Sequence, residues 1–243
     1  SLYNINYIYT SYNFILTKSY TLDKRRIYRM KKTVIFDLDG TLLDSIEDIA
    51  SSMNKVLESL KLPIHKIEDY KYFVGGGVDI LVENALNNHS KEIKDEVTKR
   101  FKVEYDGKLH SKTLPYDGIY DLLDELKKLD INLAVLSNKP HEFTVSYVNH
   151  FFKDYDFKEV HGQKEDVPKK PDPKAAIDIV KCLDSSCEKS YFIGDTKIDM
   201  QTAKSANMTA IGVLWGFRDE KELRDFGADF IVSNPLEILK IIK

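Results

Sequence analysis

From residue 118 to the end of the chain, short apolar runs alternate with segments whose apolar residues recur every three or four positions. Such runs are typical of buried strands, and the spaced pattern is typical of amphipathic helices. Strand–helix–strand units in series build a parallel sheet with helices on both faces. The strand-like runs are residues 132–136, 157–162, 191–194, 209–214 and 229–232. The sequence therefore predicts an α/β fold with a Rossmann-like parallel sheet.

A helical segment precedes this alternation. The run 33–36 is β-branched and apolar, so we expect it to join the sheet. The residues that follow it show helical spacing and no convincing strand up to about residue 112. We therefore expect an all-helical domain, residues 46–114, inserted into one α/β domain of residues 30–45 and 115–243. Its helices are expected at residues 46–60, 78–87 and 91–109.

Residues 1–29 differ from the rest of the chain. They are rich in Tyr, Asn and Ile, show no sustained period, and are followed by Met30, the first methionine. We expect an N-terminal leader or extension, whose basic residues cluster at its end, the reverse of a signal peptide. Three origins stay open: an added leader, an organelle-targeting segment or a structural arm.

The composition restricts the partners of the chain. Hydrophobic residues make up 42% of the 243 residues, enough to bury a core. The net charge of −3 lacks the basic surplus of nucleic-acid-binding proteins, and no apolar stretch approaches the roughly 18 residues that span a bilayer. Cys182 and Cys187 are too few for a structural zinc site, and we expect reduced thiols, with Cys182 buried in a helix. We therefore expect a cytoplasmic monomer or homodimer without nucleic-acid or membrane partners.

Polar residues cluster at the strand ends where a parallel sheet binds its ligands. A single cluster could be a turn or a helix cap, but several at one edge indicate a site. They are Asp37 and Asp39 after residues 33–36, Ser137 and Asn138 after 132–136, Asp195 and Asp199 after 191–194, and Lys169 and Lys170 in the loop before 191–194. Of the two lysines, Lys169 is expected to lie at the surface.

The spacing of Asp37 and Asp39 has chemical content. Side chains two residues apart in an extended segment point to the same side, roughly 6–7 Å apart, so both can contact one small ligand. With Asp195 they form a set of carboxylates that would oppose one another's ionisation unless a cation lay among them. An all-oxygen set of ligands suits Mg²⁺. Lys170 and the hydroxyl of Ser137 would then serve a phosphoryl group.

Four motifs occur in a fixed order along the chain: "DLDGTLLDS", "LSNKP", "KKPDP" and "IGDTKID". In this order they resemble the haloacid dehalogenase superfamily of phosphohydrolases, in which a helical cap is inserted after the first motif. The resemblance covers nearly all of residues 31–243. The stretches "VGGGVDILVENAL" and "GVLWGFRDEKEL" are similar to the phosphoglycolate phosphatase subgroup. Asp117 departs from it, because relatives commonly carry proline at this position of the cap linker.

The resemblance implies a role for each matching residue. Asp37 would be the nucleophile that forms an aspartyl-phosphate, and Asp39 would be the general acid and base. Mg²⁺ would be bound by Asp37, the backbone carbonyl of Asp39 and Asp195, with Asp199 as a direct or indirect ligand. Lys170 would neutralise charge on the phosphoryl group.

Three further residues would serve the phosphate or the acid. The resemblance implies that the Ser137 hydroxyl and the backbone amide of Asn138 bind phosphate oxygens, and that Thr41 orients Asp39. His141 follows the second motif closely, but we expect it to be structural or exposed. A glycine triplet in the cap is either a plain loop or a cradle for the anionic end of the substrate. It comprises Gly75, Gly76 and Gly77.

The implied function is a Mg²⁺-dependent phosphatase of a small phosphorylated substrate, with 2-phosphoglycolate favoured. Alternatives are a sugar-phosphate phosphatase, a nucleotidase, a pyrophosphatase, a β-phosphoglucomutase-like transferase and an inactive phosphate-binding protein. The transferase would need polar cap residues that the sequence does not reveal. An inactive relative would be free to lose Asp37, Asp39, Lys170 or Asp195, and all four are present. Asp39 also argues against a dehalogenase, because a halide leaves without a proton.

Overall fold

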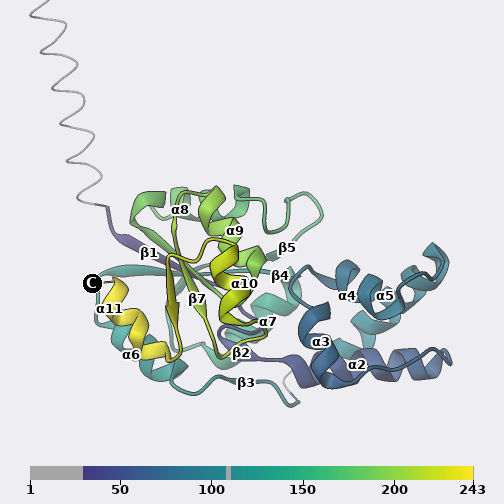
Figure 1. Ribbon diagram of the computed structural model, residues 1–243. Helices are drawn as coiled ribbons and strands as arrows, with labels where there is room; N and C mark the ends of the chain where they lie inside the picture. Colours follow the sequence, from purple (N-terminus) through teal and green to yellow (C-terminus); the bar gives the residue numbers. More distant parts are fainter. Residues whose placement is uncertain (1–29, 108–110, 243) are drawn as a thin grey trace, which may run out of the picture.

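Six parallel strands form the centre of the molecule (Figure 1). In this computed structural model the described residues are 30–107 and 111–242. The strands lie in the order β5-β4-β1-β6-β7-β8. Their bounds are β1 (Lys32–Phe36), β4 (Ile131–Pro140), β5 (Phe157–Gln163), β6 (Ser190–Gly194), β7 (Thr209–Val213) and β8 (Phe230–Val232). Because the chain fills one side of β1 and then the other, a crevice opens beyond the carboxyl end of β1.

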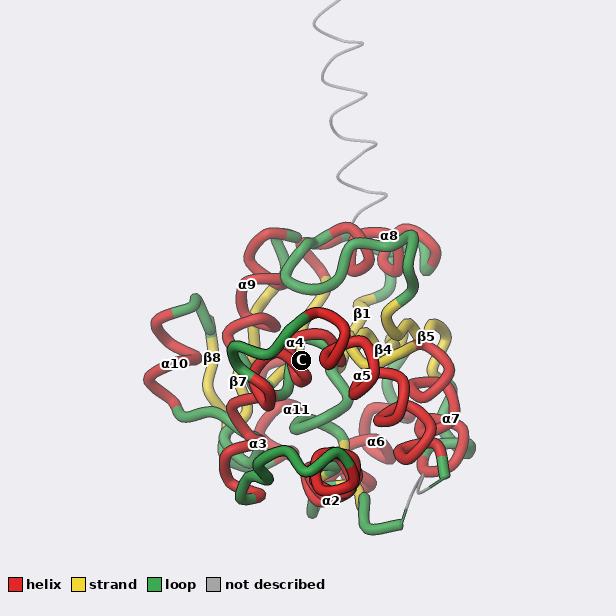
Figure 2. The backbone as a smooth tube through the Cα atoms, turned by 90° about the vertical axis from the view of Figure 1, so that its right-hand side faces the viewer, coloured by secondary structure: helices red, strands yellow, loops and turns green. Residues whose placement is uncertain are grey.

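Helices cover both faces of this sheet (Figure 2). Successive strand residues face opposite sides, so that Val34 and Phe36 pack with one set of helices and Ile35 with the other. The first set is α6 (Ile119–Lys127), α7 (His141–Phe151) and α11 (Ile238–Ile242), and the second is α8 (Lys174–Cys182), α9 (Lys197–Ser205) and α10 (Glu220–Asp225). Burial on both faces explains why the strands are apolar runs rather than alternating ones.

The predicted parallel sheet is confirmed, with one informative difference at β4. This strand continues beyond the predicted run through Ser137 and Asn138 to Pro140. Its register with β5 is irregular between Leu136 and Pro140. Such irregularities re-aim side chains, and here the irregular stretch lies at the end of the strand where the site was predicted.

A helical cap lies between β2 and β3, at the right of Figure 1. It contains α2 (Ile46–Ser59), α3 (Ile67–Phe73), α4 (Val78–Leu86) and α5 (Lys91–Asp106). The helical insertion is therefore confirmed, while the predicted end of the last cap helix, residues 108–109, lies outside the described residues. The prediction missed α3, because Tyr70 is its only buried residue and leaves no apolar period to detect.

Two short strands join the cap to the core. β2 (Leu43–Asp44) pairs antiparallel with β3 (Leu114–Pro115), so the chain leaves and re-enters the core side by side. Buried apolar side chains continue from the sheet into the cap. We propose that the two domains meet at this ribbon, with the limits expected from the sequence: core residues 30–45 and 115–243, and cap residues 46–114. The expected extension, residues 1–29, lies outside the described residues.

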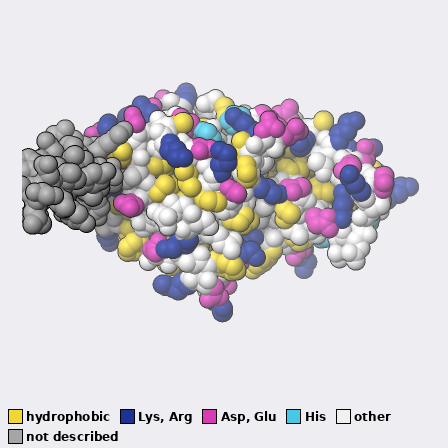
Figure 3. All heavy atoms as spheres, turned by 90° about the horizontal axis from the view of Figure 1, so that it is seen from above, with side chains coloured by type: hydrophobic (Ala, Val, Ile, Leu, Met, Phe, Trp, Pro, Cys, Tyr) yellow, Lys and Arg dark blue, Asp and Glu magenta, His cyan; other side chains and the backbone are white. Residues whose placement is uncertain are grey.

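The surface carries mixed charge and one unexpected thiol. Cys182, predicted to be buried, is exposed: it is the last residue of α8, whose buried residues Ala175, Ala176, Ile179 and Val180 lie in the earlier turns. Both cysteines are free. On the face shown in Figure 3, basic and acidic side chains are interspersed. Within residues 30–107 and 111–242, no helix has the length and apolar character to cross a membrane.

A buried carboxylate in the cap fixes the returning linker. Asp48, in the first turn of α2, is 1% exposed. It accepts hydrogen bonds from the backbone N–H groups of Lys112 and Thr113 and from the Thr113 hydroxyl, at 2.7–3.1 Å. Hydrogen bonds to a charged acceptor are stronger than neutral ones. One side chain therefore ties the end of the cap to its beginning.

Replacing Asp48 with alanine tests this clamp. Asp48→Ala leaves the buried N–H and hydroxyl of Thr113 unpaired, so we expect the free energy of unfolding to fall by about 2–4 kcal/mol. The control is Glu47→Ala, which removes only the exposed ion pair with Lys112 and should cost less than about 1 kcal/mol. Urea denaturation followed by circular dichroism measures both. Equal losses in the two variants would contradict the clamp.

Candidate active site

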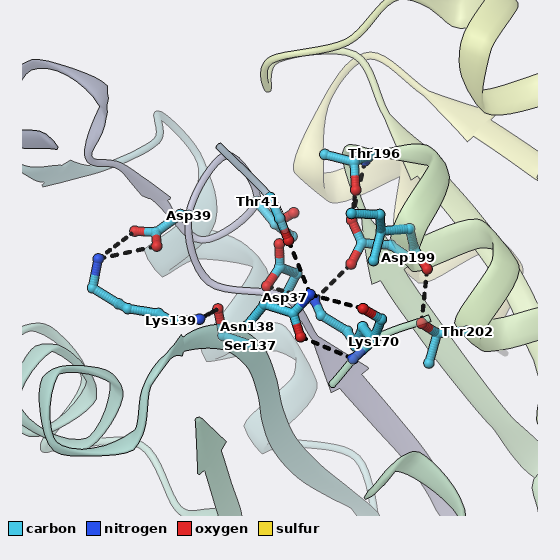
Figure 4. A network of polar contacts seen from close by, with 12 residues as sticks. Asp37, Asp39, Thr41, Ser137, Asn138, Lys139, Lys170, Thr196, Asp199 and Thr202 are labelled. Carbon is cyan, nitrogen blue, oxygen red and sulfur yellow. Dashed lines mark hydrogen bonds and ion pairs between the residues drawn. The ribbon is translucent and has the colours of Figure 1, made fainter. Parts of the chain in front are cut away.

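The predicted site residues meet beyond the carboxyl ends of β1, β4 and β6, which are neighbours in the sheet (Figure 4). They come from four separate parts of the chain. Asp37 and Asp39 follow β1, Ser137 and Asn138 lie near the end of β4, Lys170 lies in the loop before α8, Asp195 follows β6, and Asp199 lies in the first turn of α9. The fold therefore collects in one place the polar residues that the sequence spreads over more than 160 positions.

The turn after β1 is built for close contact with Asp195. The backbone N–H of Asp37 donates to the carbonyl of Ile193 at 2.9 Å, so the pairing with β6 extends to Asp37 itself. Gly40 then has a φ of +86°, and a Cβ at this position would lie 2.3 Å from a carboxylate oxygen of Asp195. Only glycine tolerates both the turn and this approach. The glycine of "DLDG" therefore lets the loop after β1 pack directly against Asp195, the residue that follows β6.

Three carboxylates share a small buried volume, which we call the acidic cluster: Asp37, Asp195 and Asp199. One oxygen of each lies within 4.8 Å of the others. Lys170 Nζ lies 2.8 Å from Asp37 Oδ1 and 2.7 Å from Asp199 Oδ1. When all three carboxylates are ionised, this single lysine leaves two negative charges uncompensated. That surplus equals the charge of one divalent cation.

Burial changes the acidity of these groups. Loss of hydration raises the pKa of Asp37 to about 7; Lys170 lowers it, whereas Asp199 and Asp39 raise it further by repulsion. Burial also raises the pKa of Asp195 well above its usual range, and the charges of Asp199 and Asp37 add to the shift. Burial lowers the pKa of Lys170, but the same two carboxylates outweigh this and raise it. The lysine therefore stays charged while the carboxylates resist ionisation.

The acidic cluster fits a divalent metal ion. Its donors are all oxygens, which hard cations such as Mg²⁺ prefer. Asp37 Oδ1 is buried, and within the described part of the chain no N–H or O–H is directed at it well enough for a hydrogen bond, although Lys170 Nζ is close. A cation among the carboxylates would satisfy this oxygen and offset the repulsion that raises the pKa values.

Backbone and hydroxyl donors orient the other two members of the cluster. Thr196 donates to Asp199 Oδ2 from its backbone N–H at 3.0 Å and from its hydroxyl at 2.7 Å, in a capping box that starts α9. Asp195 Oδ2 accepts from the backbone N–H of Phe217 at 2.8 Å, and its Oδ1 accepts from the Thr41 hydroxyl at 3.2 Å. Asp199 therefore caps a helix and faces the cluster at the same time.

Asp39 lies in a different environment from Asp37. Its side chain is 17% exposed and is not a member of the acidic cluster. Ser45 Oγ donates to Asp39 Oδ1 at 2.5 Å, and Lys139 Nζ lies 3.1 and 3.0 Å from its two oxygens. Thr41, predicted to orient Asp39, contacts the acidic cluster instead. The orienting hydroxyl in this structure belongs to Ser45, which the sequence did not single out.

Lys139 connects Asp39 to the cap. Its side chain is 4% exposed, and its Nζ donates to Tyr105 Oη, at the end of α5, at 2.7 Å. The ammonium lies 4.6 Å and 4.7 Å from the ring centres of Tyr105 and Tyr147, within the range of cation–π attraction. The sequence prediction missed Lys139 although it belongs to "LSNKP". The motif contained the signal, but its burial between two tyrosines is a tertiary feature.

Asn138 joins three segments through its side chain. It exchanges two hydrogen bonds of 2.9 Å with the backbone of Lys170 and donates to the carbonyl of Gly75 at 3.0 Å. The prediction concerned its backbone amide and missed this use of the side chain. Ser137 Oγ accepts from the backbone N–H of Lys139 at 3.3 Å and lines the cavity described below. Asn138 therefore fixes the lysine loop and contacts the cap.

Core side chains also hold a series of cap carbonyls, and we call these contacts the cap latch. The pairs are Arg218 with Lys71 and Val74, Asn138 with Gly75, and Lys169 with Gly76. Lys169, predicted to be a surface lysine, is half-buried here and also pairs with Asp79 at 2.6 Å. The sequence did not reveal this role of Arg218, because the cap groups that accept its hydrogen bonds are backbone carbonyls, which leave no side-chain signal.

A small cavity of about 50 Å³ lies between cap and core, above Asp37 and Asp39. Apart from Tyr105, the cap side chains that line it are apolar. They are Ile49, Val74, Val78, Leu81 and Phe101. Gly75 and Gly77 contribute backbone, whereas Gly76 is not part of the lining. His141 lies outside this lining, and its Nδ1 accepts from the backbone N–H of Gly162 at 3.2 Å.

A parallel sheet with carboxylates and a lysine at its ligand-binding edge, closed by an inserted helical cap, defines a class of capped α/β hydrolases. Residues 34–213 match the family described as haloacid dehalogenase-like hydrolase. The chain belongs to this family. Residues 34–213 include the acidic cluster, Asp39, Ser137, Asn138 and Lys170.

Known relatives specify the kind of hydrolase. A phosphoglycolate phosphatase of Psychrobacter arcticus is 32% identical over 216 residues, which cover 85% of this chain and 90% of the relative. One of Pseudomonas savastanoi pv. phaseolicola is 29% identical over 217 residues, covering 87% and 79%. The crystal structure of a "predicted phosphatase" from Clostridium acetobutylicum is 28% identical with a TM-score of 0.79, covering 88% of this chain and 98% of the other. The chain is therefore a phosphatase of this family.

The raised pKa of Asp37 predicts a pH-dependent stability in metal-free buffer. The pKa is 3.8 in an unperturbed carboxyl and about 7 in the folded chain. The folded chain therefore keeps a proton on Asp37 that the unfolded chain loses more easily. The contribution of this proton to the free energy of unfolding is fully present below the pKa of the unfolded chain and is lost as the pH rises through 7. Asp37→Asn removes this titrating group. We therefore expect the free energy of unfolding of the variant, relative to that of the natural chain, to rise by about 2–3 kcal/mol from pH 5 to pH 8.

Urea denaturation in the presence of a chelator measures this advantage at both pH values. The control is Asp121→Asn, which alters an exposed carboxylate on α6 and should change stability by less than about 0.5 kcal/mol at either pH. With saturating Mg²⁺, the free energy of unfolding of the natural chain at pH 8 should no longer be lower than that of Asp37→Asn. A stability difference that does not change with pH would contradict the effect assigned to Asp37.

Proposed function

We propose that this phosphatase hydrolyses a small phosphomonoester with Mg²⁺ through an aspartyl-phosphate on Asp37, and that its substrate is 2-phosphoglycolate. The observation that carries the proposal is the contrast between two carboxylates two residues apart. Asp37 lies in the acidic cluster against Lys170, whereas Asp39 lies toward the cavity against Ser45 and Lys139. The contrast suits one carboxylate to attack and the other to transfer protons.

The acidic cluster would bind the metal ion. Asp37, Asp195 and Asp199 offer one oxygen each, and the backbone carbonyl of Asp39 would complete the set. Bound there, Mg²⁺ would neutralise charge on the phosphoryl oxygens and keep the carboxylates ionised at neutral pH. Lys170 supplies the remaining positive charge, since it contacts two members of the cluster and has a raised pKa.

In the first step Asp37 attacks phosphorus. A bond forms between a carboxylate oxygen and phosphorus while the bond from phosphorus to the alcohol oxygen breaks. The Ser137 hydroxyl and the backbone amide of Asn138 would bind the phosphoryl oxygens, and Lys170 would balance their charge. Thr41 supports the step indirectly, because its hydroxyl holds Asp195. Uncatalysed hydrolysis of phosphate monoesters is so slow that these effects must act together.

Asp39 carries the proton in both steps. It gives a proton to the departing alcohol, and it then takes one from the water that attacks the aspartyl-phosphate and releases phosphate from Asp37. Ser45 and Lys139 hold its carboxylate at the cavity, outside the acidic cluster. This separation supports the assignment, because a proton carrier must not be fixed as a metal-bound anion.

The cavity favours a small leaving group with few hydroxyl groups. The apolar cap lining offers few partners for the hydroxyl groups of a sugar or a nucleoside, which would be costly to bury unpaired. This also disfavours a transferase that returns the phosphoryl group to a sugar. The relatives named phosphoglycolate phosphatase, at about 30% identity over most of the chain, support the same substrate. As predictions, we retain a cytoplasmic location and a monomeric or homodimeric state.

A panel of phosphoesters tests the substrate. We expect kcat/KM for 2-phosphoglycolate to exceed that for glucose 6-phosphate, a nucleoside monophosphate and pyrophosphate by at least about tenfold, because the mainly apolar cap lining offers few partners for the additional polar groups of these competitors. Activity should vanish with a chelator and return with Mg²⁺. A sugar phosphate or nucleotide ranked first would refute the substrate, and undiminished activity in chelator would refute the metal.

The Asp39→Asn variant tests the acid. An alkoxide leaving group needs a proton, whereas p-nitrophenolate hardly does, so we expect turnover of 2-phosphoglycolate to fall about 10- to 100-fold more than the first step with p-nitrophenyl phosphate. Pre-steady-state measurement of nitrophenol release isolates that step. Asp37→Asn is the matched control, since it should abolish turnover of both substrates. Equal losses for both substrates in Asp39→Asn would remove its role as acid.

A further inference from the structure

The cavity contains a positive charge that the proposed chemistry uses only to hold Asp39. Among the described residues that line it, Lys139 alone is a lysine or arginine. Lys170 lies beneath Asp37 and is not part of the lining. A second anionic group on the substrate, distant from the phosphoryl group, would therefore find one cationic partner in a cavity whose cap side is mainly apolar.

We propose that Lys139 is a specificity-determining residue that binds the carboxylate of the substrate's leaving group. The proposal rests on the proposed function and names the residue behind its preference for a phosphorylated acid. Lys139 would donate a charge-assisted hydrogen bond to the carboxylate, and Tyr105 would fix the ammonium from the cap side.

The position of Asp39 sets the distance. To protonate the leaving alcohol, Asp39 must contact the oxygen that bridges carbon and phosphorus. Lys139 Nζ lies 3.0 and 3.1 Å from the two Asp39 oxygens. A carboxylate one methylene away from the bridging oxygen, as in 2-phosphoglycolate, would therefore lie within reach of the same ammonium.

The surroundings of Lys139 allow it to give up one contact with Asp39 and to contact the substrate carboxylate instead. Two of its contacts go to Asp39 and one goes to Tyr105 Oη. Asp39 also accepts from Ser45, so it keeps a partner if the substrate takes one of the lysine contacts. The rings of Tyr105 and Tyr147 hold the ammonium in place without offering it a negative charge. Its strongest partners are therefore carboxylates, one of the protein and one of the substrate.

A matched pair of substrates tests the proposal. 2-Phosphoglycolate and 2-hydroxyethyl phosphate differ only in that a hydroxymethyl group replaces the carboxylate. We expect the natural chain to prefer the acid in kcat/KM by about 10- to 100-fold. In Lys139→Met, which keeps the apolar stem beside the tyrosine rings, both rates should fall because Asp39 loses a contact, but the preference for the acid should also disappear.

Ser45→Ala is the matched control, because it removes the other polar contact of Asp39 without removing the positive charge. It should slow both substrates by similar factors and leave the preference intact. If Lys139→Met behaves like Ser45→Ala, Lys139 only positions Asp39 and the proposal is refuted. Lys139→Gln serves as a second uncharged variant should the methionine variant fold poorly, and circular dichroism checks both.

A second substrate pair separates this inference from the proposed substrate. If the natural chain rejects 2-phosphoglycolate yet prefers 3-phosphoglycerate to glycerol 3-phosphate, and Lys139→Met loses that preference, the proposed substrate is wrong and the role of Lys139 stands. If the natural chain prefers the acid in neither pair, Lys139 does not bind a carboxylate.

Discussion

The burial of three carboxylates around one lysine is the arrangement on which the rest of the structure depends. Asp37, Asp195 and Asp199 repel one another in a place with little hydration, and Lys170 balances only one of the three charges. The fold holds them there by sheet pairing beside Asp37, a capping box around Asp199 and a backbone donor to Asp195. A site built this way is ready for a divalent cation and for phosphate chemistry, because rigid neighbours keep the charges together before any ligand arrives.

Three consecutive residues of β4 connect this cluster to everything around it. Ser137 presents a hydroxyl to the cavity, Asn138 fixes the Lys170 loop and contacts Gly75 of the cap, and Lys139 contacts Asp39. Alternation along the strand points the first and third of these to the same side, and both line the cavity together with Asn138. The register of β4 with β5 is irregular in this stretch. One short segment of β4 therefore contacts the cavity, Asp39 and the cap.

The sequence predicted the sheet, the helical insertion and the residues of the acidic cluster, because each depends on a local pattern. Apolar runs mark the strands, and the carboxylates follow them directly. Contacts between distant segments left no such pattern. Arg218 donates hydrogen bonds to backbone carbonyls of the cap, and the hydrogen-bond partners of Lys139 lie in the cap and in the first loop. The exposed Cys182 shows the same limit, since periodicity gave its helix and the buried side but not that the last residue of the helix lies outside the core.

The cap controls more than access to the cavity. Tyr105 of the cap contacts Lys139, which contacts Asp39, so the surroundings of Asp39 are made by both domains. A cap moving away as a body would have to break this contact together with the latch contacts of Arg218 and Asn138, while Asp48 keeps the two linkers joined. Closing it would restore all of them at once and exclude water from the first step. The proposed acid, Asp39, is therefore fully positioned only when the cavity is closed, which would tie its proton transfer to the presence of an enclosed substrate.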